Sequence, residues 1–509
     1  MSRERVESVV ESDEAVYGIN TGFGKLVTER IERDDLDDLQ LNLLRSHASG
    51  SGPELDHDVV RAMLLSRLQA LTLGYSGVRE VIVDRLAALL NEGVHPVVRS
   101  RGSLGASGDL APLAHLALVL VGEGQATIQS SGETTSREDA EHSTEAVSGE
   151  EALERAGIEP VELAPKEGLA LINGTQLTTG LGALAVVEAE RLLDIADAAG
   201  ALTTEVAMGT TVASSDAIAG VRPHPGHAVS ATNVRRLTAD SEIVDSHRNC
   251  DRVQDAYSLR CLPQVHGATR DAVRHLREAV TTELNSATDN PLIFGAEEVD
   301  PQTSQTETAA VVSGGNFHGA PLAHRLDYAT SALVDVASMS ERRIDRLLNP
   351  SIQEPHLTPF LANESGLESG LMIAQYTAAS LVSEARTTGT AGTDNIPVSG
   401  NQEDHVSMSA TAAFRLADCL DTLQRVVAIE LLCGVEAAEY VDETHGTGTS
   451  VLYETVRERI DPLAGDRPLA PDIDRLSAAI EAGEIHERVE TALDDGFADF
   501  DDGERYTKT

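Results

Sequence analysis

A glycine-rich run at residues 102–115 constrains this chain more than any other part of its sequence. It reads Gly-Ser-Leu-Gly-Ala-Ser-Gly-Asp-Leu-Ala-Pro-Leu-Ala-His, and the apolar residues within and after it recur at helical spacing. Pro112 is tolerated in the first turn of a helix. The run therefore predicts a tight loop that leads straight into a buried helix, with the tripeptide Ala106-Ser107-Gly108 at the helix's positive end.

Two common uses of a glycine-rich loop do not match this run. A phosphate-binding loop would end in Lys followed by Ser or Thr, where this chain has Asp109 and Leu110. A hydrolase nucleophile elbow has one residue between the serine and the second glycine, whereas Gly108 follows Ser107 directly. Taken alone, the tripeptide is also compatible with a plain turn before a helix.

The charge balance of the chain points to a salty compartment. The net charge is −44, from 39 basic and 83 acidic residues, and only three of the basic residues are lysines. Such a surface repels itself in dilute buffer, and concentrated salt screens the repulsion. We therefore expect a halophilic source and loss of structure at low salt. Nucleic-acid binding is disfavoured because no basic patch is visible.

Cysteine usage and hydropathy predict a cytoplasmic protein that does not bind membranes. No apolar run reaches the length of a membrane span, and the N-terminus is charged. The cysteines lack metal-ligand spacing, so we expect no metal site and thiols that are reduced and mostly buried. They are Cys250, Cys261, Cys419 and Cys433.

Helical periodicity dominates the chain beyond residue 176, and strand signals are few and short. The hydrophobic content of 41% is ample for a large core. We therefore expect a mainly α protein, with a long central helical bundle and a smaller N-terminal domain that carries the Ala-Ser-Gly loop. The long helices are predicted at about 176–198, 266–286, 321–348 and 405–441. The predicted domains are residues 1–175, 176–450 and 451–509.

Shorter elements are predicted on either side of the bundle. Residues 2–15 form a polar helix, and 59–90 are helical with a break near Gly74. The polar stretch 129–150 is typical of an exposed insertion, and Ser148 with Glu151 predicts a capping box. The acidic tail from residue 491 is expected to be exposed.

Further segments, spread between residues 17 and 408, resemble the aromatic amino acid ammonia-lyases, as does the run at 102–115. The segments are Tyr17–Gly24, Ser46–Gly50, Lys166–Thr175, Gln254–Arg260, Gly314–Gly319 and Gln402–Met408. The chain departs from the family pattern at 98–101, where it carries two arginines. Only sixteen residues precede Tyr17, which suggests a trimmed or misassigned start.

The resemblance implies that the chain makes its own cofactor, 4-methylidene-imidazol-5-one. In the family the amide nitrogen of the glycine attacks the alanine carbonyl, and the ring then loses two waters. The residue types suit this chemistry, because Gly108 leaves its nitrogen unhindered and Ser107 supplies a hydroxyl that is eliminated. Ala106 is small enough to lie within the new ring.

The resemblance also implies roles for single residues. Tyr17 would remove the β-proton, and a phenol needs a lowered pKa to do so. Asn173 would hydrogen-bond the substrate or the imidazolone oxygen, and Phe317 would pack against either of them. Alone, Tyr17 and Asn173 are equally compatible with ordinary turn residues before glycines.

Three residues in one stretch are implied to hold the substrate. Arg260 would bind both oxygens of its carboxylate, because the guanidinium fork suits that geometry. Tyr257 and Gln254 would orient the ring and the substrate. Their spacing of three residues allows all three side chains to share one helical face. A surface ion pair is the usual role of a single helical arginine.

Two positions resemble the histidine-specific members of the family. His47 follows Ser46 as in those members, and Glu403 stands where they carry a glutamate. Read alone, the Glu-Asp-His at 403–405 could be metal ligands or a helix cap, but no second cluster supports a metal. Glu403 can accept an imidazole N–H.

The implied activity is the non-oxidative deamination of L-histidine to trans-urocanate and ammonia, which opens histidine degradation. The family also implies a homotetramer with active sites shared between subunits. One alternative keeps the chemistry but acts on tyrosine or phenylalanine, as an ammonia-lyase or an aminomutase. The other alternative is a helical scaffold without the cofactor.

Overall fold

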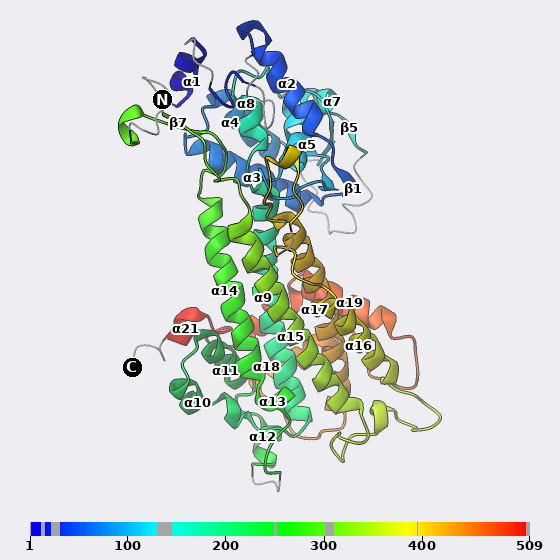
Figure 1. Cartoon of the computed structure of the whole chain (residues 1–509). Helices are drawn as coiled ribbons and strands as arrows, with labels where there is room; N and C mark the ends of the chain where they lie inside the picture. Colours follow the sequence, from blue (N-terminus) through cyan, green and yellow to red (C-terminus); the bar gives the residue numbers. More distant parts are fainter. Residues whose placement is uncertain are drawn as a thin grey trace. The chain divides into compact units, whose positions relative to one another are not determined.

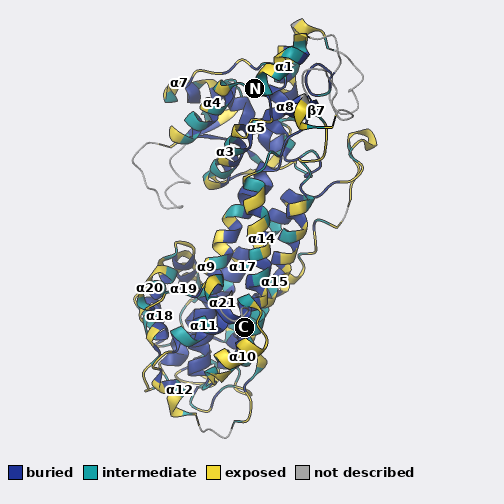
Figure 2. Ribbon diagram, turned by 90° about the vertical axis from the view of Figure 1, so that its left-hand side faces the viewer, coloured by how far each residue is buried: buried dark blue, intermediate teal, exposed yellow. Residues whose placement is uncertain are grey.

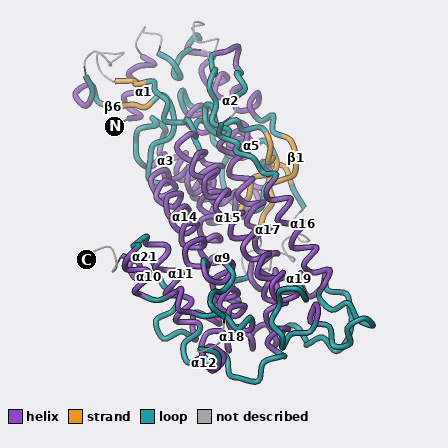
Figure 3. Tube along the Cα trace, turned by 60° about the horizontal axis from the view of Figure 1, so that its bottom comes forward, coloured by secondary structure: helices purple, strands orange, loops and turns teal. Residues whose placement is uncertain are grey.

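The computed structural model describes residues 2–11, 16–21, 31–129, 145–248, 252–300, 310–393 and 395–504. Helices predominate and strands are short, so the prediction of a mainly α protein is confirmed (Figure 3). Most of the stretch 129–150 that we interpret as an insertion lies outside the described residues.

The chain divides into two compact units. Unit 1 contains Met1–Leu184, Leu276–Asp327 and Thr390–Phe414. Unit 2 contains Ala185–His275, Tyr328–Gly389 and Arg415–Thr509. Four long helices contribute residues to both units, namely α9 (Gln176–Val206), α14 (Leu262–Leu284), α15 (Ala320–Leu348) and α17 (Ser409–Ala438). The division into three domains that we expect from the sequence stays a prediction.

Unit 1 surrounds its helices with small antiparallel sheets (Figure 1). Its shorter helices are α1 (Ser2–Glu11), α2 (Leu36–His47), α3 (His57–Thr72), α4 (Glu80–Asn91), α5 (Leu110–Leu120), α7 (Gly149–Ala156) and α8 (Glu167–Ile172). Its strands are β1 (Ser51–Glu54), β2 (Val94–Pro96), β3 (Arg99–Arg101), β4 (Gln125–Ile128), β5 (Val147–Ser148), β6 (Leu292–Phe294) and β7 (Ala310–Val312). The sheets have the orders β1-β3, β2-β4-β5 and β6-β7.

The predicted break and cap in unit 1 are both present. Helix α3 ends at Thr72 and α4 begins at Glu80, with Gly74 between them at a φ of +81°. The Ser148 hydroxyl accepts the backbone N–H of Glu151, which confirms the serine half of the predicted capping box. Helix α5 is almost entirely buried, as its apolar sequence predicts.

The long helices agree with the predicted ranges except at their ends. Helix α17 begins at Ser409 rather than at residue 405. The cause is that the segment before it binds the 102–109 loop instead of extending the helix. The N–H of Met408 donates to the Leu104 carbonyl at 2.8 Å, and the Ser407 hydroxyl donates to the Gly105 carbonyl at 2.9 Å.

Unit 2 is helical throughout its described residues, apart from its connecting loops. Its shorter helices are α10 (Asp216–Val221), α11 (Pro225–Leu237), α12 (Glu242–Ser246), α13 (Tyr257–Arg260), α16 (Met372–Arg386), α18 (Thr447–Arg457), α19 (Ala470–Glu481), α20 (Glu484–Ala492) and α21 (Phe500–Glu504). Its core is apolar but contains buried ion pairs, such as Arg343 with Glu430 (Figure 2). Arg343 lies on α15 and Glu430 on α17, so this pair joins two of the long helices.

The expectation of an exposed acidic tail is wrong for much of it. Leu493 and Ala498 are buried, and Asp502 forms an ion pair with Arg236 on α11 at 3.0 Å. The tail alternates acidic residues with apolar ones, and the apolar side chains anchor it against the unit. Residues 505–509 lie outside the described part of the chain.

The thiols that the structure describes are reduced. Cys419 and Cys433 are buried and Cys261 is half-buried, while Cys250 lies outside the described residues. Burial raises the pKa of the Cys419 thiol to about 12, which makes it unreactive. Over the described ranges, no helix is long and apolar enough to cross a membrane, and no group of three or more His, Cys, Asp or Glu could hold a metal ion.

Candidate active site

The tripeptide 106–108 is pressed against the segment that follows α8. Gly108 has a φ of +76°, and a Cβ atom there would lie 2.2 Å from the Gly174 carbonyl oxygen. That oxygen accepts the backbone N–H of Asp109 at 2.6 Å. Only glycine can occupy position 108 in this arrangement, since any side chain would clash with backbone.

Asp109 ties the loop together from inside the protein. Its fully buried carboxylate accepts the Ser103 hydroxyl at 2.6 Å and the backbone N–H of Thr178 at 2.9 Å. Burial raises the pKa of Asp109, and these hydrogen bonds oppose the shift. The carboxylate therefore joins the start of the loop to the start of α9.

Asn173 meets the loop from the end of α8. Its side-chain Nδ2 donates to the Ser107 carbonyl at 3.0 Å. Its Oδ1 is buried and has no hydrogen-bond partner among the residues that the structure describes. A buried acceptor without a donor is rare, and it leaves this amide able to receive one more hydrogen bond.

Glu403 meets the same tripeptide from the segment before α17. Its Oε1 accepts the Ser107 hydroxyl at 2.9 Å. Ser107 therefore has partners on both of its oxygen atoms, with Asn173 at the carbonyl and Glu403 at the hydroxyl. These contacts bring together three of the residues that the sequence singles out, although they lie far apart along the chain.

His47 is the last residue of α2, and the charge of Glu403 acts on its imidazole. Its Nδ1 donates to the Leu43 carbonyl at 2.9 Å, which assigns the proton to that nitrogen because a carbonyl can only accept. Burial lowers the pKa of His47, while the Leu43 carbonyl and the charge of Glu403 oppose the shift. A half-buried neutral imidazole therefore stands near a carboxylate beside the loop.

Tyr17 and Phe317 are carried by two turns of unit 1. Tyr17 is half-buried in a turn in which Gly18 packs against Leu169 of α8 and against Pro291. The rest of its segment, residues 22–24, lies outside the described residues. Phe317 is half-buried two residues before Gly319, whose N–H donates to the Gly105 carbonyl at 3.2 Å. Both turns thus touch elements that hold the loop.

Gln254, Tyr257 and Arg260 belong to unit 2. Gln254 and Tyr257 are exposed, and the Arg260 guanidinium lies 4.8 Å from the centre of the Tyr257 ring. The expectation that all three share one helical face is wrong, because α13 begins at Tyr257. The residues before it are held out of the helix by Asp255, whose carboxylate accepts the N–H of Thr210 at 2.8 Å.

Sequence reasoning missed a buried polar layer behind the loop. Arg67, Lys166 and Asp289 are almost completely buried in unit 1, and Lys166 pairs with Asp289 at 3.1 Å. Two signals could have found Arg67 and Lys166. Arg67 stands where the apolar pattern of α3 requires a core residue, and Lys166 is one of only three lysines in the chain.

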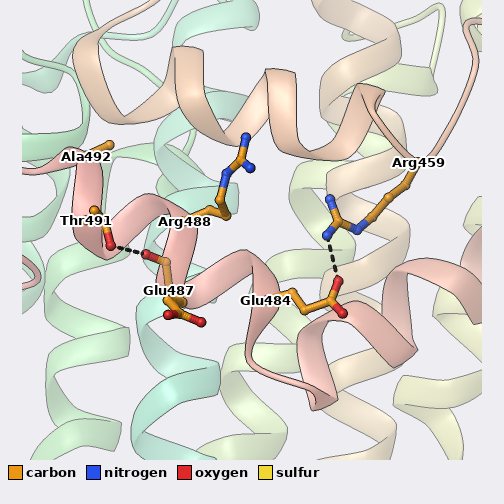
Figure 4. A pocket seen from close by; sticks show the side chains of 6 residues that line it. All are labelled: Arg459, Glu484, Glu487, Arg488, Thr491 and Ala492. Carbon is orange, nitrogen blue, oxygen red and sulfur yellow. Dashed lines mark hydrogen bonds and ion pairs between the residues drawn. The ribbon is translucent and has the colours of Figure 1, made fainter.

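The hollows found in unit 2 contain none of the predicted site residues. One of about 520 Å³ lies beside α20 and is lined by charged residues, with Arg459 and Glu484 paired across it at 2.6 Å (Figure 4). Another, of about 710 Å³, runs along α16 and α19. The concentration of polar contacts around Ser107 therefore singles out the loop in unit 1 as the candidate active site.

Comparison with known proteins identifies relatives over most of the chain. A family profile described as aromatic amino acid lyase matches residues 1–458. A probable histidine ammonia-lyase of Halobacterium salinarum is 59% identical over 97% of this chain and 92% of its own length. A histidine ammonia-lyase of Gloeobacter violaceus is 48% identical over 96% of this chain and 91% of its own length.

Solved structures share the fold. Tyrosine aminomutase from Streptomyces globisporus has a TM-score of 0.87 and 36% identity, covering 98% of this chain and 93% of that one. Histidine ammonia-lyase from Trypanosoma cruzi has a TM-score of 0.84 and 35% identity, covering 99% of this chain and 90% of that one.

Proposed function

The chain belongs to the aromatic amino acid lyase family, and we propose that it converts L-histidine to trans-urocanate and ammonia. The observation that carries the choice of substrate is the position of Glu403, which binds Ser107 and also acts on His47. A carboxylate accepts an imidazole N–H, and the unprotonated Nε2 of the neutral His47 ring can accept a further hydrogen bond. Relatives named histidine ammonia-lyase match nearly the whole chain.

The loop fits the cofactor that its family makes from such a tripeptide. Gly108 is packed so closely on Gly174 that no side chain could stand there, which keeps its nitrogen unhindered. The Ser107 carbonyl, which would become the ring oxygen, accepts the Asn173 amide. The orphaned Oδ1 of Asn173 leaves a hydrogen-bonding position beside it. We propose that Ala106, Ser107 and Gly108 form 4-methylidene-imidazol-5-one.

When formed, this group supplies an electrophilic carbon at the former Ser107 side chain. The surrounding residues stabilise developing charge and hold the substrate. Asn173 donates to the Ser107 carbonyl oxygen and so stabilises negative charge that develops there. Glu403 accepts an N–H of the substrate imidazole, and His47 contributes to recognition of the same ring. Each of these groups is fixed by the fold before substrate arrives, which keeps the reorganisation small.

The proton transfer and the carboxylate site involve three more residues. Tyr17 removes the β-proton of the substrate, which requires its pKa to fall well below the usual value near ~10. Arg260 binds the substrate carboxylate with both arms of its guanidinium, and Gln254 and Tyr257 orient the substrate. Phe317 packs against the substrate or the new ring.

The proposal extends to assembly and environment. We propose a homotetramer in which subunits share active sites, and the exposure of Gln254 and Tyr257 supports this. The charge of −44 and the match to a Halobacterium protein support a cytoplasm of high salt as the working environment. The expected result is a single tetrameric species by light scattering in molar KCl, and loss of helical signal in dilute buffer. A stable monomer in molar KCl would contradict the assembly.

The decisive experiment follows urocanate absorbance with purified protein and L-histidine in molar KCl, with L-tyrosine and L-phenylalanine in parallel. We expect product from histidine alone. Ser107→Ala is the matched control, because it removes only the hydroxyl that must be eliminated and should abolish turnover.

A second candidate is an aminomutase or ammonia-lyase acting on tyrosine or phenylalanine, favoured by the TM-score of 0.87 to a tyrosine aminomutase. Product from either of those amino acids, or an isomerised amino acid, would support it and refute the histidine assignment. A wild-type protein whose mass equals that of its sequence, with no water lost, would refute both candidates.

A further inference from the structure

Helix α8 is a short element that is anchored to an unusual degree. All of its residues, Glu167 to Ile172, are buried. At its start, the buried ammonium of Lys166 pairs with Asp289 at 3.1 Å. The Glu167 carboxylate accepts from the Arg79 guanidinium at 2.7 Å and 2.9 Å. A six-residue helix is not stable alone, so these contacts fix the position of α8 and of the residues that follow it.

Arg67 of α3 holds the other end of α8. Its guanidinium is completely buried and donates to the carbonyl of Ala170 at 3.1 Å and to that of Asn173 at 2.8 Å. It also donates to the side-chain oxygen of Gln176, the first residue of α9. The last carbonyls of a helix have no partners within it, and Arg67 supplies them from another element. Arg67 therefore links the end of α8 to the start of α9 across this turn.

That turn contacts the reacting tripeptide from one side, as Glu403 does from another segment of unit 1. The amide of Asn173 donates to the Ser107 carbonyl, and the next carbonyl, that of Gly174, accepts the N–H of Asp109. Arg67 lies directly behind it, since a Cβ atom on Gly174 would come within 2.8 Å of its guanidinium. A displacement of Arg67 would thus move both contacts on the tripeptide together.

The electrostatic setting of Arg67 differs from that of a structural arginine. Its hydrogen bonds in the described part of the chain go to carbonyl and amide oxygens rather than to a carboxylate. Burial lowers its pKa to about 10, against the attraction of Asp289 and Asp109, so it stays charged at neutral pH. Burying a cation without a bonded carboxylate costs free energy, and the hydrogen bonds from Arg67 to these buried oxygens offset part of that cost.

We propose that Arg67 is a positioning residue for the cyclisation of Ala106-Ser107-Gly108, acting through Asn173 and Gly174. The inference rests on the proposed function. In the step concerned, a bond forms between the Gly108 nitrogen and the Ala106 carbonyl carbon. One water leaves with the Ala106 oxygen and the N–H protons of Gly108 and Ser107. The second leaves with the Ser107 hydroxyl and its Cα proton, and no oxidant is needed.

The test compares three variants of the full chain, each folded in molar KCl and isolated by size exclusion. Arg67→Met removes the donors and keeps the bulk. Arg67→Lys keeps the charge but places it on one nitrogen, without the planar fork that reaches separate carbonyls. Arg343→Lys is the matched control, because Arg343 is an equally buried arginine of unit 2 that is bonded to Glu430. The readout is the mass of the tryptic peptide 102–137 over time after folding.

We expect the wild type and Arg343→Lys to give a peptide lighter by two waters. Folded Arg67→Met should lose water about 10²-fold more slowly, as expected for a misplacement of about 1 Å at a reacting centre. Folded Arg67→Lys should be roughly tenfold slower, because it loses one charged hydrogen bond. Once cyclised, Arg67→Lys should show a lower kcat with little change in KM.

Three results would overturn the proposal. Water loss at the wild-type rate in a folded Arg67 variant would show that the turn holds its position without Arg67. If the peptide 102–137 is two waters lighter in every variant and kcat is unchanged, Arg67 is likewise not needed to position the turn. If neither Arg67 variant folds while Arg343→Lys does, Arg67 serves folding rather than positioning. A wild type that loses no water would instead refute the proposed function itself.

Discussion

Arginine is buried in both units of the molecule but in opposite electrostatic settings. In unit 1, Arg67 is bonded to backbone carbonyls, and burial lowers its pKa to about 10. In unit 2, Arg270 is bonded to Asp194 at 2.8 Å and Asp197 at 2.6 Å. Burial lowers the pKa of Arg270 too, but the two carboxylates outweigh it and raise the pKa above its usual value. Among the described residues, the first arginine is bonded to no carboxylate, whereas the second is compensated by two.

The difference separates two uses of a buried charge. A compensated pair crosslinks helices, and its loss is expected to appear as loss of stability. An uncompensated charge beside a reacting loop is retained for what it positions, and its loss should appear in chemistry. The predictions below test this division, starting with the largest expected effect.

Removing the Arg270 guanidinium of unit 2 should strongly lower the free energy of unfolding and leave the cyclisation of the tripeptide unchanged. Arg270→Met leaves Asp197 buried with only Asn233 and His266 as partners, and should lower the free energy of unfolding by about 3–5 kcal/mol. Denaturant unfolding in molar KCl measures the loss. The Ser107 peptide of the folded variant should still be two waters lighter.

The double variant Arg270→Met, Asp197→Asn is the control for the stranded charge. It should recover at least about 1 kcal/mol, because the uncompensated carboxylate is gone. If the double variant is no more stable than the single one, charge compensation is not what Arg270 supplies.

Removing the Asn173 amide, which donates to the loop of unit 1, should have the reverse effect: a large loss of turnover with little change in stability. Asn173→Ala should lower kcat by about 10²–10³, the range seen when one preorganised donor to developing charge is lost. The unfolding free energy should change by no more than about 2 kcal/mol. Steady-state kinetics and denaturant unfolding measure the two effects. A variant with unchanged kcat and a fully cyclised peptide would remove Asn173 from the reaction.

The contrast between the two units also explains what the sequence could predict. The helices of the bundle and α5 follow from apolar periodicity, which is a local property, although α9 extends to Val206, well past its predicted end near residue 198. The contacts of Ser107 join residues 107, 173 and 403, and a resemblance to a family could suggest them where spacing could not.

The failures have a common physical cause. Helix α17 starts late, and Gln254 lies outside α13, because residues before each helix bind distant segments instead. The Met408 N–H donates to the Leu104 carbonyl, and the Asp255 carboxylate accepts the N–H of Thr210. Arg67 could not be assigned to the loop from sequence, since its partners are mostly backbone carbonyls and carry no signature of their own. Tertiary hydrogen bonds to backbone override local propensity without leaving a trace in the pattern.

His95 of unit 1 is a second buried group without a bonded carboxylate in the described residues. It should make the stability of the protein sensitive to acid pH. Burial, with help from His57 and Arg61, lowers the pKa of His95 to about 4. An unfolded histidine titrates near ~6.5, so the unfolded chain binds more protons between these values. Stability should therefore fall by roughly 2 kcal/mol as the pH drops from about 6.5 to about 4.

The measurement is the unfolding free energy in molar KCl across that pH range, for the wild type and His95→Gln. The variant cannot take up the proton, so its stability should depend less on pH in this window. His266 of unit 2 is the comparison, because burial lowers its pKa while the bonded Asp197 opposes the shift. Equal slopes for the wild type and His95→Gln would contradict the assignment.

Exposed arginines give the smallest effect and complete the series. Arg488 beside the hollow of Figure 4 pairs with Glu458 at 3.0 Å, and both side chains are 53% exposed. Water and molar salt screen such a pair, and holding two long side chains in one geometry costs entropy. Arg488→Gln should therefore change the unfolding free energy by less than about 0.5 kcal/mol and leave turnover unaltered. A loss comparable to that of Arg270→Met would mean that burial does not decide what an arginine contributes, and the distinction between the two units would fail with it.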